Sequence, residues 1–227
     1  NWTLPVTIPP GAPSSPLSWS ADGKSIIFVK VSTPYSGDGQ FRTIQILTLS
    51  DGTIKPITSR TQFESYPIFS PDGSTISYWY KKGGANADIN EIWVTTKTGG
   101  EGKNVTANLN RDVYRSIWMP DGKSFLVGGH DDNKTSLWIQ SLDGTAAKID
   151  VGNVSPSWSF WIDASVGKNG SIAFIGSETM QPTELYYLSS AKSKPVRLTD
   201  FNKEVKAMTF GKTETIYWEN DAFRHCG

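Results

Sequence analysis

The hexapeptide Trp118-Met119-Pro120-Asp121-Gly122-Lys123 separates two short apolar runs, and its pattern returns as Trp19-Ser20-Ala21-Asp22-Gly23-Lys24 and Phe69-Ser70-Pro71-Asp72-Gly73-Ser74. A weaker copy occupies residues 166–174, where Asn169-Gly170 stands in place of Asp-Gly. The turn residues Asp22, Asp72, Asp121 and Asn169 are separated by 50, 49 and 48 positions. Asp-Gly and Asn-Gly favour tight hairpin turns because these residues tolerate positive φ. Each copy therefore predicts a strand, a turn and a second strand.

Two further strands are predicted in every repeat. Runs rich in β-branched and aromatic residues follow the hairpins at residues 44–47, 91–94, 136–139 and 184–188. A second turn comes next, at residues 51–52, 99–100, 143–144 and 191–193, and short runs at 55–58, 103–106, 147–150 and 196–199 close the repeats. Four strands with a period of about 40–50 residues are typical of a β-propeller blade. The strands of a β-sandwich do not recur in such regular sets.

The predicted fold is all-β, with very little helix: a propeller of four-stranded antiparallel blades that forms a single domain over residues 1–227. Four full repeats cover residues 17–61, 62–109, 110–153 and 154–201, and a partial fifth covers 202–223. In the fifth, residues 205–210 and 214–218 are predicted strands. Residues 2–8 are another candidate strand, followed by a Pro/Gly/Ser linker at 9–16. Strands from both termini can share a blade and close the ring at about five blades; an open ring would favour self-association through its exposed edges.

Charge and composition argue against several classes of partner. The 22 basic and 22 acidic residues balance, so the chain has no electrostatic footprint for nucleic acid or anionic lipid. No apolar run approaches the ~18 residues that a membrane-spanning helix needs. We therefore expect no nucleic acid and no membrane among its partners. Cys226 is the only cysteine, so no internal disulfide can form. The cysteine content therefore does not distinguish an oxidising from a reducing cellular compartment.

Catalytic and metal motifs are missing from the sequence. A serine hydrolase of the α/β type needs a Gly-x-Ser-x-Gly elbow and a histidine base, and no such elbow occurs. His130 is interpreted as an exposed histidine of a loop at 128–133, and His225 as part of the C-terminal tail. Asp131-Asp132-Asn133 lacks the calcium-loop pattern, and Lys81-Lys82-Gly83-Gly84 lacks the phosphate-loop spacing. We therefore expect no catalytic residue, no metal site and no cofactor in this chain, and its binding residues remain open.

Three acids keep a glycosidase reading open, because some propeller enzymes use paired carboxylates in a central pocket. Asp163 lies on a predicted innermost strand, while Glu64 and Asp112 shortly precede two others. Each of the three is otherwise a solvated acid near a strand end.

The tryptophans divide into two groups. Trp19 and Trp118 occupy the same place in the repeat, so both are predicted to be core residues that pack between blades. Trp158 and Trp161 fall outside the repeat pattern and are the better candidates for a binding surface, although core packing is an equal alternative.

The repeated hexapeptide looks like the Trp-Ser-Pro-Asp-Gly-Lys repeat of the periplasmic Tol-system propeller protein and of prolyl oligopeptidase family peptidases. The C-terminal third is more specific. It reads Ser171-Ile172-Ala173-Phe174-Ile175-Gly176-Ser177, then Pro182-Thr183-Glu184-Leu185-Tyr186-Tyr187-Leu188, then Val196-Arg197-Leu198-Thr199-Asp200-Phe201-Asn202. This resembles the last blades of bacterial acylaminoacyl-peptidase and dipeptidyl-peptidase relatives. The resemblance covers residues 17–223 and departs from the pattern at Met119, Asn169 and Ala222.

The resemblance implies a function for the whole domain. In that family the segment similar to Thr215-Ile216-Tyr217-Trp218 leads into a catalytic α/β-hydrolase domain, and the non-catalytic propeller covers its active site and restricts substrate size. The implied partners are that hydrolase domain and a peptide substrate, in a bacterial cytoplasm or periplasm. Two alternatives stay open: a stand-alone scaffold for protein or glycan, like the Tol-system propeller, and a propeller glycosidase.

Overall fold

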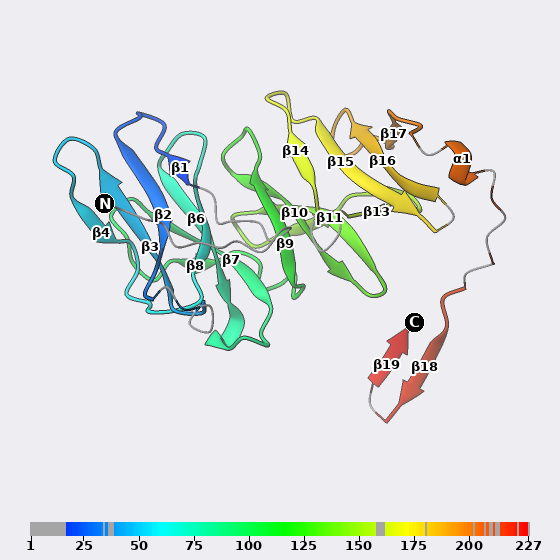
Figure 1. Cartoon of the computed structure of the whole chain (residues 1–227), viewed down its shortest axis with the longest axis horizontal. Helices are drawn as coiled ribbons and strands as arrows, with labels where there is room; N and C mark the ends of the chain where they lie inside the picture. Colours follow the sequence, from blue (N-terminus) through cyan, green and yellow to red (C-terminus); the bar gives the residue numbers. More distant parts are fainter. Residues whose placement is uncertain are drawn as a thin grey trace. The chain divides into compact units, whose positions relative to one another are not determined.

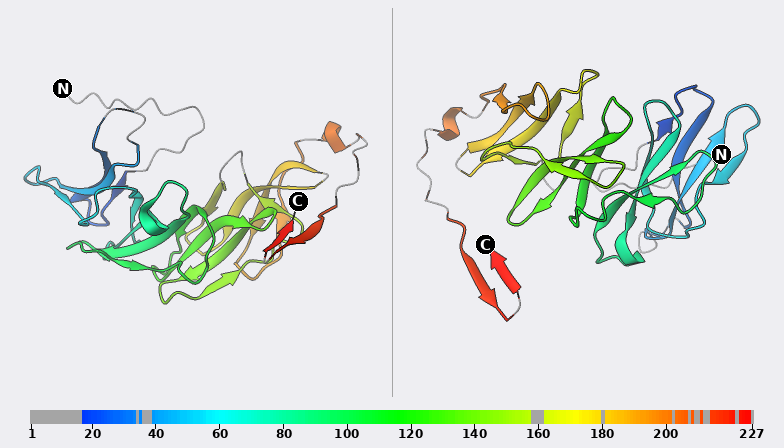
Figure 2. Two further views of the ribbon diagram at one scale, coloured as in Figure 1. Left: turned by 90° about the horizontal axis from the view of Figure 1, so that it is seen from below. Right: turned by 180° about the vertical axis from the view of Figure 1, so that it is seen from behind.

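The computed structural model describes residues 17–226, apart from residues 34, 36–38, 158–161, 180, 202, 207, 209–210, 212–213 and 222. Almost all of the regular structure is antiparallel β-sheet, as predicted. The predicted strand at 2–8 and the linker at 9–16 lie outside the described residues. Figure 1 shows the sheets following one another along the chain, and Figure 2 gives two further views of them.

Four sheets form from consecutive strands. The first sheet holds β1 (Ser18–Trp19), β2 (Ser25–Val31), β3 (Arg42–Thr48) and β4 (Ile54–Pro56). The second holds β5 (Ser65–Phe69), β6 (Thr75–Lys81), β7 (Asn90–Thr96) and β8 (Lys103–Asn104). The third holds β9 (Val113–Trp118), β10 (Ser124–Asp131), β11 (Lys134–Ser141) and β12 (Ala146–Lys148). The fourth holds β13 (Ser155–Pro156), β14 (Ala164–Val166), β15 (Ile172–Glu178), β16 (Gln181–Leu188) and β17 (Val196–Arg197). The predicted four-stranded repeat is therefore confirmed in the first three sheets, whereas the fourth sheet has five strands.

The predicted hairpin turns form at one end of each sheet, called here the turn end. The side-chain oxygens of Asp22, Asp72, Asp121 and Asn169 each accept a hydrogen bond from the backbone N–H two residues later, at 2.8–3.2 Å. The glycine after each of them has a positive φ, between 63° and 81°. Asn169 thus performs the same task as the three aspartates, which explains how the weaker fourth copy still makes the turn.

Met119 shows how the third repeat compensates for a lost hydroxyl. In the first two repeats a serine hydroxyl donates to the turn aspartate, from Ser20 to Asp22 and from Ser70 to Asp72. Met119 occupies that place in the third repeat, and there Ser124 Oγ donates to Asp121 at 3.2 Å instead. The turn therefore tolerates the departure from the pattern.

The opposite end of each sheet, called here the loop end, carries longer connections. Here the second strand passes to the third, and the fourth strand leaves for the next sheet. The connection between β6 and β7 contains a 3-10 turn, η2 (Lys82–Gly84). Backbone bonds at this end recur from sheet to sheet, because Ile57, Val105, Ile149 and Leu198 donate to Ile44, Ile92, Leu137 and Leu185. The backbone at the loop end is therefore held in the same way in all four sheets, while the side chains there differ from sheet to sheet.

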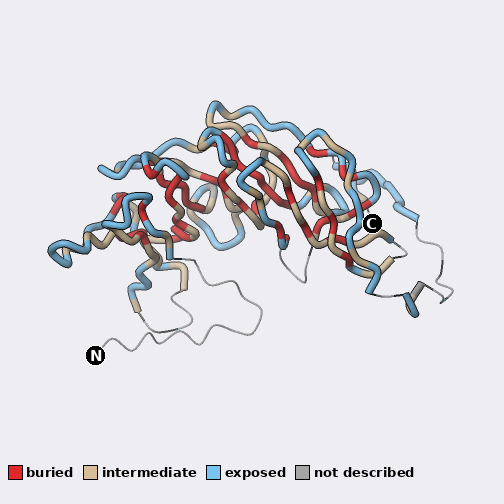
Figure 3. The backbone as a smooth tube through the Cα atoms, turned by 90° about the horizontal axis from the view of Figure 1, so that it is seen from above, coloured by how far each residue is buried: buried red, intermediate tan, exposed pale blue. Residues whose placement is uncertain are grey.

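The chain divides into two compact units. The first contains the first and second sheets with the turn at 141–145, and the second contains the rest of the third sheet, the fourth sheet and the C-terminal segment. In the first unit, Ile27 and Ile44 of the first sheet pack against Phe69, Ile76 and Tyr78 of the second. In the second unit, the third and fourth sheets pack through Leu126, Leu137, Ile149, Ile172, Phe174, Tyr186 and Leu188. Figure 3 marks the buried stretches of the backbone in red. Each unit thus has its own sheet-on-sheet core.

The C-terminal segment corrects part of the prediction. A strand is predicted at residues 205–210, but residues 205–206 belong to a short helix, α1 (Lys203–Lys206), and residues 207 and 209–210 lie outside the described part of the chain. The second predicted strand begins later than expected, as β18 (Tyr217–Asn220), and pairs with β19 (Phe223–Cys226). Lys203, Glu204 and Lys206 are good helix formers, and the apolar alternation needed for a strand is short here.

Candidate functional site

The innermost strands of the sheets are irregular at the loop end. In the second sheet the register shifts between Ser65 and Ile68, where Tyr66 has a φ of 52°. In the third sheet the register shifts at Gly128 and Gly129, opposite Tyr114. Bulges of this kind re-aim side chains and are common beside functional sites. Tyr66 and Tyr114 therefore both lie in bulges of the innermost strands of successive sheets.

Aromatic stacking holds both bulge tyrosines. The ring of Tyr66 stacks on Trp79, with centroids 4.2 Å apart, and the ring of Tyr114 stacks on His130 at 4.5 Å. The Tyr114 hydroxyl donates to Asp112 Oδ2 at 3.1 Å. Burial raises the pKa of Tyr114, and the neighbouring Asp112 charge raises this pKa further. Tyr114 therefore stays a neutral hydrogen-bond donor to Asp112.

In the fourth sheet the innermost strand is divided in two, β13 and β14, and the chain between them is an insertion. Both β13 and β14 pair with β15, and the chain between them leaves and returns at one residue, Ile175. Ile175 accepts from Ser157 N–H at 3.0 Å and donates its own N–H to Asp163 O, also at 3.0 Å. Trp158 and Trp161, the predicted surface tryptophans, belong to this insertion but lie outside the described residues.

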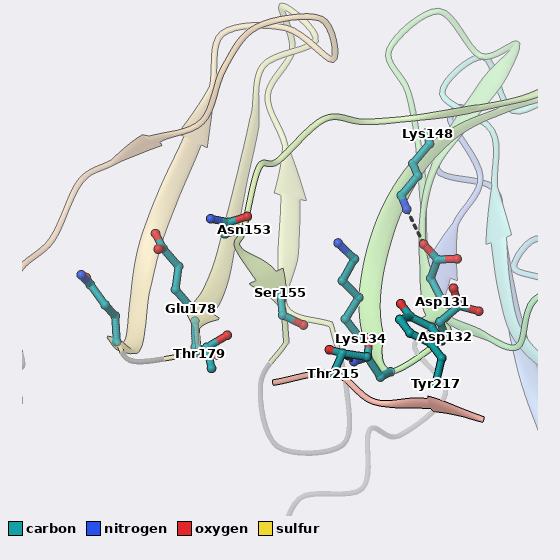
Figure 4. Close-up of a pocket in the computed structure, with 13 residues that line it drawn as sticks. Asp131, Asp132, Lys134, Lys148, Asn153, Ser155, Glu178, Thr179, Thr215 and Tyr217 are labelled. Atoms are coloured by element: carbon teal, nitrogen blue, oxygen red, sulfur yellow. Dashed lines mark hydrogen bonds and ion pairs between the residues drawn. The ribbon is translucent and has the colours of Figure 1, made fainter. Parts of the chain in front are cut away.

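A polar groove opens at the loop end of the second unit, with a volume of about 980 Å³. One side is formed by the β10–β11 connection, with Asp131, Asp132 and Lys134, and the other by Glu178 and Thr179 of the fourth sheet (Figure 4). Asn133, Lys148, Asn153, Ser155, Ser177, Gln181, Thr215 and Tyr217 complete the lining. Charged, amide and hydroxyl groups dominate, so the groove suits a polar ligand that is read by hydrogen bonds.

Asp131 organises one wall of this groove. Its side chain is 13% exposed and pairs with Lys148 Nζ and with Arg111 Nε, the latter at 3.4 Å. Ser136 Oγ donates to the same carboxylate at 2.9 Å. Burial raises the pKa of Asp131, but the hydrogen bonds from Lys148 and Ser136 and the charge of Lys148 outweigh it, so the pKa is lowered overall. Asp131 is therefore an ionised anchor at neutral pH and a poor proton donor.

Replacing Asp131 by Asn should lower stability by about 1 kcal/mol at pH 7, because two cations and one hydroxyl lose a charged partner. The folded pKa of Asp131 lies below its unfolded value, so the contribution is present above the unfolded pKa and lost as pH falls through the folded pKa. Urea unfolding of D131N and wild type at pH 7 and pH 3 measures this. Equal deficits at both pH values would contradict the assignment.

Glu64, one of the three candidate acids, is a buried hydrogen-bond acceptor. It is fully buried, Oε2 accepts from Ile44 N–H at 2.9 Å, and Oε1 accepts from the Thr58 hydroxyl. Glu184 repeats this arrangement in the fourth sheet, where its Oε2 accepts from the Thr199 hydroxyl and from Phe201 N–H. Both acids therefore satisfy backbone and hydroxyl donors where a fourth strand leaves its sheet.

The other predicted site residues have separate environments. Asp112 is half-buried and bonded to Tyr114, whereas Asp163 is exposed beside the insertion. His130 is exposed as predicted, but it lies at the end of strand β10 rather than in a loop. His225 lies on β19 and stacks on Trp218 at 5.6 Å.

Trp118 is 7% exposed and confirms the core prediction, but Trp19 is 59% exposed, so that prediction is wrong. Trp118 packs against Phe125 of its own sheet, with ring centroids 4.0 Å apart. Trp19 lies on the two-residue strand β1, on a face of the first sheet that stays exposed.

Sequence reasoning missed one constellation, around Arg60. The guanidinium carbon lies 4.2 Å from the ring centroid of Tyr80 and 4.3 Å from that of Trp93. The same group donates to the Tyr78 hydroxyl and, at 3.0 Å, to Glu101 O. Burial raises the pKa of Tyr78 to about 12, although the Arg60 charge and hydrogen bond act in the opposite direction. No sequence motif predicts this cluster, because its aromatic residues come from two strands and its arginine from a connection.

No group of three or more His, Cys, Asp or Glu side chains in the described part of the chain lies close enough to hold a metal ion. Among the same residues, no helix is long and apolar enough to cross a membrane.

The repeated sheets and their Asp-Gly turns define a protein built from β-propeller blades. Its sequence resembles the propeller region of prolyl oligopeptidase family serine peptidases. It is 28% identical over 194 residues to dipeptidyl-peptidase 5 of Porphyromonas gingivalis, covering 83% of this chain and 27% of that protein. It is also 28% identical over 109 residues to the uncharacterized peptidase YuxL of Bacillus subtilis, covering 48% of this chain and 16% of that protein. No model of a known family matches, and the chain spans under a third of either relative.

Solved structures share the fold. The acylaminoacyl peptidase of Pyrococcus horikoshii aligns with a TM-score of 0.63 at 16% identity, over 89% of this chain and 30% of that one. A putative TolB from Agrobacterium tumefaciens gives 0.60 at 23% identity, over 81% and 61%. The oligogalacturonate lyase of Vibrio parahaemolyticus gives 0.63 at 11% identity, over 82% and 53%. These likenesses support the propeller fold, and the peptidase resemblance depends on the sequence relatives.

Proposed function

We propose that the chain is the non-catalytic propeller part of a prolyl oligopeptidase family serine peptidase, whose active site lies on an α/β-hydrolase domain outside these 227 residues. The observation that carries this is the similarity to dipeptidyl-peptidase 5, which covers 83% of this chain but only 27% of that protein. A match confined to the propeller repeats fits a module that accompanies the catalytic domain. In this role the propeller covers the hydrolase active site and limits the size of the peptide that enters.

The geometry of the loop end agrees with a gating and binding role. Each described sheet keeps a constant frame there, while bulges, an insertion and a polar groove vary from sheet to sheet. Variable side chains on a rigid scaffold are the usual setting of binding residues. The two histidines stack on aromatic rings, and Glu64 is used for structure, so the proposal places no hydrolytic role on them.

The native gene product provides the first test. We expect a protein longer than this chain by about one large domain, roughly 250 residues, that a fluorophosphonate probe labels at one serine. The purified 227-residue chain should neither take up the probe nor hydrolyse fluorogenic dipeptides. A native product of about the same length as this chain, or turnover by the purified chain that survives repurification, would contradict the proposal.

Substrate size provides the second readout. In the full-length protein, kcat/KM should fall steeply between short peptides and the same sequence carried in a folded protein. Equal kcat/KM for both substrates would remove the gating role while leaving the peptidase assignment intact.

The second candidate is a stand-alone scaffold, favoured by the coverage of 61% of the putative TolB chain. A native product without a hydrolase domain would support it. The glycosidase alternative loses one of its three candidate acids, because Glu64 is fully buried and bonded to Ile44 and Thr58.

A further inference from the structure

A second hollow lies beside the polar groove, between the last two strands of the fourth sheet and the connection that enters that sheet. Its volume is about 380 Å³, near the small end of the range usual for ligand pockets. Its lining includes Val151, Val154, Glu178, Tyr186, Lys194 and Arg197. Every residue that lines it is described and belongs to the second unit, so the hollow does not depend on how the two units are placed.

Tyr186 brings an unpaired hydroxyl to this hollow. The residue is 3% exposed, and its ring stacks on Phe174 in the core of the second unit, with centroids 5.5 Å apart. Its buried hydroxyl has no hydrogen-bond partner among the described residues. A buried tyrosine hydroxyl usually has such a partner, because leaving it unpaired lowers stability. The hydroxyl therefore points to a polar group that enters the hollow and pairs with it.

A free carboxylate and a guanidinium both act on this hydroxyl. Burial raises the pKa of Tyr186, the charge of Glu178 raises it further, and the charge of Arg197 lowers it. Glu178 stands at the end of β15, and its side chain makes no hydrogen bond or ion pair in the described part of the chain. The hollow thus offers an unpaired acid that a cationic group of a ligand can neutralise.

Two cations belong to the same lining. Arg197 lies opposite Tyr186 in the register of β16 and β17, and its guanidinium donates to Gln181 Oε1 at 2.8 Å. This bond orients the guanidinium, which has further N–H groups for an anionic group of a ligand. Lys194 pairs with Asp150 and adds a second positive charge to the lining.

The remaining wall is apolar and rigid. Val151 and Val154 are 7% and 4% exposed and belong to the same core cluster as Tyr186. A turn joins them, in which Val154 N–H donates to Val151 O at 3.4 Å and Gly152 has a φ of 64°. Such a wall suits an apolar side chain placed between charged groups of both signs.

We propose that this hollow binds a small apolar zwitterion, a free amino acid or a dipeptide, whose ammonium pairs with Glu178 and whose carboxylate pairs with Arg197. The carboxylate also accepts from the Tyr186 hydroxyl, which supplies the partner that this buried group lacks. The apolar side chain of the ligand packs on Val151 and Val154. Hydrogen bonds to charged groups are the stronger ones, so both ends of the ligand contribute to affinity.

Tyr186→Phe separates binding from folding. Because the hydroxyl has no partner, its removal should leave the urea midpoint of the ligand-free chain unchanged or slightly raised. Titration calorimetry of the wild-type chain with L-leucine and with glycyl-leucine should give a dissociation constant of about 0.1–1 mM for at least one of them. Y186F should bind at least about fivefold more weakly.

Tyr187→Phe is the matched control. Tyr187 is the next residue of β16, pairs with Ala173 and Val196, and does not line the hollow, since successive residues of a strand point to opposite faces. Y187F should bind both ligands as the wild type does.

Altered ligands identify the two charged contacts. N-acetyl-leucine lacks the ammonium and leucinamide lacks the carboxylate, so each should bind at least about tenfold more weakly than leucine. Glu178→Gln should weaken leucine by a similar factor and leave N-acetyl-leucine unchanged. Arg197→Gln should weaken leucine and leave leucinamide unchanged.

Binding of leucine alone would support a free amino acid as the ligand, and binding of glycyl-leucine alone would support a dipeptide. If neither binds the wild-type chain up to about 10 mM, the proposal is overturned. It is also overturned if Y186F is less stable than the wild type without ligand, since the hydroxyl then already has a partner, or if E178Q binds leucine like the wild type. The assay measures binding to this chain alone, so its failure leaves the peptidase proposal untouched.

Discussion

Replacing Glu64 by Ala should lower the free energy of unfolding by about 2–4 kcal/mol, because it leaves buried donors unpaired and opens a cavity. The side chain is fully buried and accepts from Ile44 N–H at 2.9 Å and from the Thr58 hydroxyl. These partners belong to the first sheet and to the connection that leaves it for the second. The loss should therefore loosen the first unit, and urea unfolding measures it directly.

Glu64→Gln should separate hydrogen bonding from charge. Burial raises the pKa of Glu64, although the bonds from Thr58 and Ile44 and the charge of Arg60 oppose the shift. Because the folded pKa lies above the unfolded value, the contribution of this group to stability is fully present below the unfolded pKa and lost as pH rises through the folded pKa. E64Q should therefore gain stability relative to wild type between pH 4 and pH 8.

The control for both variants is Glu219→Gln, at an exposed acid of β18, which should change stability by less than about 0.5 kcal/mol. The structural assignment of Glu64 fails if E64A unfolds at the wild-type urea concentration. It also fails if E64Q is as unstable as E64A at both pH values, since the amide fills the same space and its oxygen can still accept from Ile44 N–H.

The repeating frame could be predicted from the sequence because it depends on local chemistry. Asp-Gly and Asn-Gly select their turns through contacts within a few residues, and the structure shows that Asp22 and Asn169 make the same bond to the N–H two residues later. The prediction failed at Trp19, where burial depends on a neighbouring sheet and not on the repeat itself. It also failed at residues 205–206, where local helix propensity outweighed the repeat pattern.

The candidate site could be predicted much less well. Glu64 attracted attention as an acid near an innermost strand, but its role depends on Thr58 and Ile44, which the register of β3 brings to it. The groove needs the β10–β11 connection and the start of β16 side by side, a relation between sheets that no linear pattern encodes. The bulges that contain Tyr66 and Tyr114 become visible only when the register shifts of β5 and β9 are known.

Arg60→Ala should lower the free energy of unfolding by about 2–3 kcal/mol, combining lost cation–π contacts, a lost charged hydrogen bond and lost packing. The side chain is 11% exposed, and its guanidinium lies against the rings of Tyr80 and Trp93. It also joins the connection after β4 to Glu101 O, in the turn between β7 and β8. The ion pair to Glu101 adds little, because that carboxylate is 61% exposed.

Arg60→Lys should recover less than half of this loss, since an ammonium lacks the planar face that a guanidinium lays against an aromatic ring while it donates to Tyr78 and Glu101. Tyr80→Leu should cost less in an R60A background than in the wild type, by about 0.5–1 kcal/mol, if the two side chains interact. Arg197→Ala is the matched control, because Arg197 is exposed and pairs only at the surface with Asp200 and Gln181. Additive losses for Arg60 and Tyr80, with full rescue by lysine, would show that the charge alone matters and that the aromatic rings do not hold the guanidinium. If instead the losses of R60A and Y80L are not additive and lysine does not restore stability, the contacts of the Arg60 guanidinium with the aromatic rings fix the path of the chain from the first sheet to the second.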